Sequence, residues 1–123
     1  MKVILPYPDP ELSPNRKNGK HWSATKKSKD AAFAAGYYLT MEASLKSGEL
    51  ILRDKIPLDI TFVQCDKRRR DLDNLLASAK PACDGIAKAL GIDDIQFEPI
   101  TLKRDYDKSG SRMVVEITLN VPS

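Results

Sequence analysis

Hydrophobic and polar positions recur with two different periods along the chain, and these periods predict two helices and four strands. Apolar residues repeat at helical spacing through residues 23–47 and again through residues 72–90. Strand-like runs occupy residues 3–5, 57–65, 99–103 and 113–121. The predicted order is β-α-β-α-β-β, which indicates an α+β fold with a small mixed sheet packed by two helices. Because 123 residues suffice for one core but not for two, residues 1–123 are expected to form a single domain.

Local signals refine this outline. Four prolines predict an extended, irregular segment over residues 6–14. Pro81 lies inside the second helical pattern and predicts a kink or a split near residues 77–80. Residues 107–110 read Asp-Lys-Ser-Gly and predict a hairpin turn between the last two strands.

The sequence lacks the residues that several common kinds of catalytic or binding site require. His21 is the only histidine, so a zinc site and a Ser-His-Asp triad are not expected. The chain has no GxGxxG motif and no Walker loop, so no small organic cofactor is expected. No apolar stretch has the length of a signal peptide or a membrane span, so no membrane contact is expected. Cys65 and Cys83 are expected to be reduced and buried, which favours the cytoplasm.

Charge is unevenly distributed, although the net charge is only +3. Residues 12–29 contain no acid and include six bases, namely Arg16, Lys17, Lys20, Lys26, Lys27 and Lys29. This run favours a polyanionic partner, with a solvated loop and helix start as the alternative. The aromatic residues Trp22, Tyr37 and Tyr38 are expected to pack on the core rather than to stack on bases.

The most densely charged segment follows the second predicted strand. Seven of the eight residues at 66–73 are charged, three of them acids and four of them bases. A second acidic pair, Asp93 and Asp94, comes just after the helix predicted at 72–90. Two converging carboxylate clusters beside arginines suggest a divalent metal facing a phosphate. The alternative is a solvated loop of local ion pairs that ends in a helix N-cap.

Here the residues resemble a known family. The run Arg69-Arg70-Asp71-Leu72-Asp73-Asn74-Leu75, followed by Asp84 and by Ile92-Asp93-Asp94, is similar to that of the RusA family of Holliday junction resolvases. The segments Pro6-Tyr7-Pro8 and Ser13-Pro14-Asn15 also look like that family's N-terminal loop. The resemblance implies a homodimeric endonuclease, dependent on Mg²⁺ or Mn²⁺, that nicks four-way DNA junctions symmetrically in recombination and repair. It also favours a phage or prophage origin and a bacterial cytoplasm.

The resemblance also implies roles for individual residues. Catalysis would use Asp71, Asp73, Asp94 and Lys80, and the metal would be held by Asp71, Asp73, Asp93 and Asp94, all within one copy of the chain. DNA contacts are expected from Asn15, Arg16, Lys17, Lys20, Lys27, Arg69 and Arg70. The sequence departs from the family at Ala77, where the family has a lysine. An insertion of three residues after Asn74 would bring Lys80 and Asp84 into register with the family's lysine and following aspartate.

Two other functions are compatible with the same fold. One is a DNA-binding module with weak or no cleavage, which Ala77 supports. The other is a small phosphatase or phosphotransferase, which the basic run at 12–29 disfavours because a small substrate does not need six bases. A homodimer would use either the strand at 113–121, as an exposed edge, or the helix at 23–47.

Overall fold

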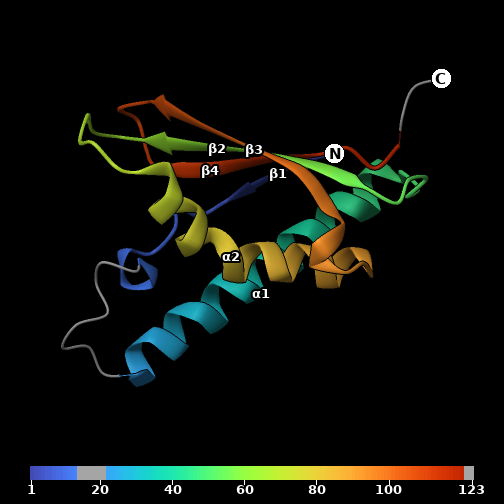
Figure 1. Cartoon of the computed structure of the whole chain (residues 1–123), viewed down its shortest axis with the longest axis horizontal. Coiled ribbons are helices and arrows are strands. Elements are labelled where there is room, and N and C mark those ends of the chain that lie inside the picture. The colour runs from blue at the N-terminus through green and yellow to red at the C-terminus, as the bar shows by residue number, and fades with distance from the viewer. Residues whose placement is uncertain (14–21, 121–123) are drawn as a thin grey trace.

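A mixed four-stranded sheet lies against two long helices in the computed structural model, which describes residues 1–13 and 22–120 (Figure 1). The strands are β1 (Lys2–Leu5), β2 (Ile56–Gln64), β3 (Phe97–Tyr106) and β4 (Arg112–Ile117), the helices are α1 (Trp22–Ser47) and α2 (Leu72–Leu90), and the 3-10 turns are η1 (Pro10–Leu12) and η3 (Asp94–Gln96). The predicted α+β class and the order of the long elements are confirmed.

The strand order in the sheet is β1-β4-β2-β3. β4 pairs antiparallel with β1 and β2, whereas β3 pairs parallel with β2. The parallel pair follows from α2, because a helix between two strands returns the chain to the same end of the sheet. The predicted hairpin is therefore wrong: residues 107–110 do turn, with a 3.2 Å bond from Gly110 N to Asp107 O, but β3 and β4 are not neighbours.

The last predicted strand is also corrected. Residues 113–121 were expected to form an exposed edge, but β4 ends at Ile117 and lies between β1 and β2. β3, predicted as five residues, has ten and forms the edge instead. The strand predicted over Pro99 to Lys103 was too short because the polar end of β3, Arg104 to Tyr106, still pairs with buried β2. Pairing partners, not side-chain pattern, set the length of this strand.

Helix α2 packs one face on the sheet and continues through Pro81 without a break, so the predicted split is wrong. Its buried apolar residues Ala79, Cys83, Ile86 and Ala87 belong to the predicted stripe. Gly91 closes the helix with φ of 69°, a left-handed conformation that glycine adopts without strain. Its backbone N–H donates to the carbonyl groups of Ala87 and Lys88.

The two helices cross in backbone contact at a pair of glycines. A Cβ atom added at Gly85 would lie 2.8 Å from the amide nitrogen of Tyr37 and nearer still to the carbonyl oxygen of Phe33. A Cβ atom added at Gly36 would collide in the same way with the carbonyl oxygen of Ala82. This contact holds α1 and α2 together, and α2 contributes to the same hydrophobic core as the buried β2 residues Ile56, Leu58, Ile60 and Phe62.

Three smaller expectations are corrected as well. Tyr38 is 69% exposed rather than packed on the core, and Cys65 is exposed just beyond the end of β2. Residues 10–12 form a 3-10 turn within the segment expected to be irregular, because Asp9 caps it by accepting from Glu11 N. The side chain of Trp22 lies outside the described residues. In the described part of the chain, no helix is long and apolar enough to cross a membrane.

Candidate functional site

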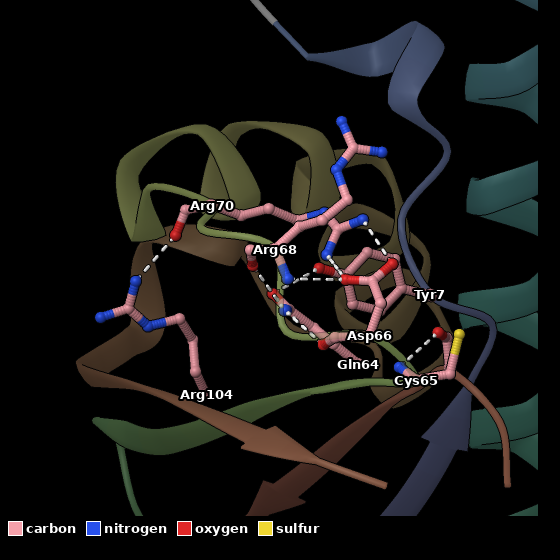
Figure 2. Close-up of polar contacts among 8 residues, drawn as sticks. Tyr7, Gln64, Cys65, Asp66, Arg68, Arg70 and Arg104 are labelled. Carbon is pink, nitrogen blue, oxygen red and sulfur yellow. Dashed lines mark hydrogen bonds and ion pairs between the residues drawn. The ribbon is translucent and has the colours of Figure 1, made fainter. Parts of the chain in front are cut away.

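The charged loop between β2 and α2 is organised around the carboxylate of Asp66. Both oxygens of Asp66 accept from the Arg70 guanidinium, at 2.8 and 3.2 Å, and one also accepts from the backbone N–H of Arg68 at 3.0 Å (Figure 2). The hydrogen bonds from Arg70 and then from the Arg68 backbone lower the pKa of Asp66 to about 2. The loop therefore keeps this ion pair at any physiological pH.

Two side chains outside the loop, one at the end of β2 and one in the N-terminal segment, also hold it in place. Buried Gln64, the last residue of β2, donates from Nε2 to the carbonyl oxygen of Arg68 at 3.0 Å, and it accepts from the Tyr7 hydroxyl at 3.3 Å. The Arg70 guanidinium lies 5.8 Å from the centroid of the Tyr7 ring, within cation–π range. Burial raises the pKa of Tyr7, so its hydroxyl remains a donor.

A third contact joins the loop to the edge of the sheet. Arg104 on β3 donates from Nη1 to the carbonyl oxygen of Arg70 at 2.8 Å (Figure 2). Arg70 is the residue before Asp71, so this bond restrains the point at which the loop enters α2. Charge-assisted bonds of this kind are stronger than neutral ones.

The loop over residues 66–71, which these contacts hold in place and which is called the braced loop below, borders a cleft of about 320 Å³. Its lining residues are Tyr7, Pro10, Ser13, Arg68, Arg69, Arg70, Asp71, Asn74, Leu75 and Ser78. Asp71 is the N-cap residue of α2, but its side chain makes no capping hydrogen bond. The carboxylate of Asp71, a residue that lines the cleft, therefore leaves the first N–H groups of α2 without the side-chain cap that an N-cap aspartate can provide.

The arginines divide into two kinds at this cleft. Arg70 was expected to contact DNA, but its guanidinium is paired with Asp66 and its side chain is 29% exposed. Arg68 was not predicted, yet it is exposed and its side chain extends away from the Asp66 network (Figure 2). Arg69 is exposed and lines the cleft as well. Arg68 and Arg69 therefore present the cationic surface, and Arg70 positions the loop.

The four predicted metal ligands are not brought together in one chain. Asp73 lies in the first turn of α2, whereas Asp93 and Asp94 follow its last turn. The 19 residues of α2, at 1.5 Å per residue, form a helix roughly 28 Å long between Asp73, near its start, and the Asp93–Asp94 pair after its end. Among the described residues, no three His, Cys, Asp or Glu side chains are grouped closely enough to hold a metal ion.

Lys80 belongs with the second acid pair rather than the first. Burial raises the pKa of Asp84, the nearby charge of Asp94 raises it further, and Lys80 opposes both effects. Lys80 and Asp84 also line a second cleft, of about 480 Å³, between α1 and α2. Beside them, burial raises the pKa of Cys83 to about 12, so this thiol is inert.

The expected DNA contacts at Asn15, Arg16, Lys17 and Lys20 lie outside the described residues. Lys27 is exposed on α1, as a phosphate contact requires. Residues that the sequence analysis missed are Tyr7, Gln64, Asp66, Arg68 and Arg104. Gln64 carried a usable signal, because it is the one polar residue at an inward position of an apolar strand. Arg104 carried none, since its partner is 34 residues away.

Comparison with known proteins places the chain in a family. No family model matches the sequence. The chain is 38% identical over 118 residues to an uncharacterized protein of Xylella fastidiosa (strain Temecula1), an alignment that covers 94% of this chain and 74% of that protein. The chain therefore belongs to the same family as the Xylella protein.

Proposed function

We propose that this protein is a Mg²⁺-dependent, structure-specific endonuclease that cleaves four-way DNA junctions as a homodimer. The observation that carries the proposal is the braced loop at the start of α2. It presents two exposed arginines, Arg68 and Arg69, beside a carboxylate, Asp71, that no capping bond occupies. The resemblance of residues 69–75, 84 and 92–94 to the RusA resolvases supports the same conclusion.

The loop has the parts that phosphodiester hydrolysis requires. Arg68 and Arg69 would bind the non-bridging oxygens of a phosphate, and the uncapped N–H groups of α2 would add further donors. Arg70 would not contact the DNA. It would keep Asp71 in place through its pair with Asp66, at 2.8 Å, and through its carbonyl bond to Arg104.

The donor set fits a hard divalent ion. Asp71 and Asp73 are both exposed and supply carboxylate oxygens, the ligands that Mg²⁺ takes while keeping several waters. Bound there, the ion would neutralise charge on the phosphate and supply an activated water. Among the described residues that line the cleft, none is the histidine or cysteine that zinc prefers.

The distance between the acid pairs determines how the site would be completed. Asp71 and Asp73 lie at the start of α2 and Asp93 and Asp94 follow its end, and no group of three such side chains among the described residues could hold an ion. A two-fold dimer with its α2 helices antiparallel would bring Asp94 of the partner subunit toward Asp71. We therefore infer that each metal site is built from two subunits, in place of the one-chain site expected from the sequence.

Mixing two inactive variants tests this arrangement. Asp73→Asn and Asp94→Asn are each expected to lose junction cleavage while retaining binding, because affinity comes from cationic contacts to phosphates. After co-refolding, a heterodimer would have one site with both substitutions and one intact site. Random exchange should restore roughly a quarter of the wild-type nicks, as single nicks rather than paired ones.

The matched control mixes Asp71→Asn with Asp73→Asn, two substitutions at the same end of α2. Every heterodimer would then have two damaged sites, so no activity should return. Restoration in the control, or none in the test mixture, contradicts a two-subunit site. A wild-type protein that binds the junction but does not cut it with Mg²⁺ or Mn²⁺ contradicts the nuclease proposal itself.

The second candidate is a junction-binding module of the same fold without cleavage. The lack of an acid cluster among the described residues of one chain favours it, and Ala77 replaces the lysine of the resolvase pattern. Binding with no cleavage under any divalent ion would support this function.

A further inference from the structure

The edge of the sheet formed by β3 is open along its length. β3 has ten residues and pairs with β2 on one side, and no strand of the described residues, 1–13 and 22–120, pairs with its other side (Figure 1). Eight of its ten residues are exposed. A long edge strand with free N–H and C=O groups is a template for pairing with another strand.

The inward side chains of this edge extend the apolar face beyond the helices. Ile100, Leu102 and Arg104 lie beside the fully buried Leu58, Ile60 and Phe62 of β2. Ile100 is nevertheless 43% exposed and Tyr106 is 47% exposed, whereas their neighbours on β2 are covered. Pro99 cannot donate a ladder bond, so the stretch available for pairing is residues 100–106.

Charge along this edge is polarised. Its beginning carries three exposed acids, Asp93, Asp94 and Glu98, of which Glu98 forms a 2.7 Å ion pair with Lys55. Its end carries Lys103 and Arg104 and adjoins the loop with Lys67, Arg68 and Arg69. Three of the acids nearby are already engaged, because Asp66 pairs with Arg70, Asp107 pairs with Arg112, and Asp105 accepts from the backbone N–H of Tyr106. A copy of the same edge in reverse direction would match acids to bases at both ends. A parallel copy would oppose like charges.

We propose that two copies of this chain associate by antiparallel pairing of their β3 strands. A two-fold axis at Thr101 or Leu102 sets apolar side chains against each other, whereas an axis at Lys103 would oppose two lysines. Two four-stranded sheets then join into one of eight strands. The pairing brings the Asp93–Asp94 turn of one copy to the end of the sheet that carries Asp71 of the other. This last link rests on the proposed function; the pairing itself does not.

Another exposed apolar surface competes for this role. Tyr38, Met41 and Leu45 share one face of α1 and are 69%, 37% and 83% exposed. This face carries no acid-to-base polarity that would orient a second copy, and its polar neighbours Glu42 and Lys46 pair with each other at 3.0 Å. Dimerisation through this α1 surface is therefore the competing hypothesis in the experiments below.

Cysteine cross-linking separates the two surfaces. In a Cys65→Ser background, Thr101→Cys and Leu102→Cys are made singly, with Leu45→Cys as the matched control on α1. Directly opposed residues of antiparallel strands have Cα atoms about 4.5–5.5 Å apart, within disulfide range. Mild oxidation of the native protein should therefore give a covalent dimer at position 101 or 102 and not at 45.

A substitution gives an independent measurement. Leu102→Glu should raise the dimer dissociation constant at least tenfold in sedimentation, while Leu45→Glu should leave it unchanged. Cross-linking at 45 alone, or a dimer insensitive to Leu102→Glu, overturns the β3 interface. Because neither assay uses DNA, such a result would leave the nuclease proposal standing if the mixed variants still restored nicking.

Discussion

Gly85→Ala tests the contact on which the placement of α2 depends. The added methyl group would lie 2.8 Å from the backbone nitrogen of Tyr37 and closer to the carbonyl oxygen of Phe33. Both atoms belong to the backbone of α1, so no side-chain rotation can make room. The helices must separate by about 1 Å, a gap that forfeits a quarter to a half of the dispersion energy of the facing atoms.

The magnitude follows from two opposing effects. Alanine is favoured over glycine inside a helix by about 1 kcal/mol. Overpacking at a rigid contact costs about 1–3 kcal/mol, and the loosened α1–α2 interface adds to that cost. We expect Gly85→Ala to lower the free energy of unfolding by about 2 kcal/mol.

Urea unfolding followed by circular dichroism measures this change, with Gly110→Ala as the matched control. A Cβ atom at Gly110 meets nothing within 4 Å, so the same chemical change there should alter stability by less than about 0.5 kcal/mol. Equal midpoints for the two variants would refute the close approach of α1 and α2 at Gly85.

Two further predictions concern charge. Arg68→Ala and Arg69→Ala should each reduce the slope of log affinity for a DNA junction against log salt concentration by about one, because each removes a phosphate contact. Unchanged slopes would show that neither arginine contacts the DNA. Asp84→Asn should stabilise the protein slightly at pH 7, by well under 1 kcal/mol given solvent screening. Because the folded-state pKa of Asp84 is raised, its ionised carboxylate destabilises the folded protein at pH values above that pKa. This destabilisation disappears as the pH falls below 3.8, the pKa of the unfolded chain, so the unfolding curves of the two proteins should coincide at low pH.

Much of the fold could be predicted because its signals are local. The periodic apolar residues of α2 and Gly91 after them mark that helix to within a residue at each end. The partner strand of β3, in contrast, could not be predicted from local signals. Residues 107–110 form a turn whether or not the strands on either side are neighbours, and only the crossover through α2 decides that β3 lies beside β2. A turn motif predicts a change of direction but not a partner strand.

The candidate site, too, could be predicted only in part. The loop at 66–73 was recognised by its density of charge, but the role of each charge depends on contacts between distant segments. Arg69 and Arg70 are adjacent in sequence, yet Arg70 alone meets Asp66 and Tyr7. The separation of Asp73 from Asp94 follows from the unbroken helix α2, which Pro81 had been expected to kink or split.

The bond from Arg104 to the carbonyl oxygen of Arg70 links the free edge of the sheet to the residue that precedes Asp71. In the proposed dimer, a strand added beside β3 would stiffen Arg104 and, through it, the entrance to α2. A single subunit would then lack the acids that its partner supplies, and its loop would be held less rigidly than in the dimer. Such a protein would be harmless to ordinary duplex DNA while it is being made, and would acquire its cutting activity only on assembly, a safeguard suited to a nuclease that shares a compartment with a chromosome.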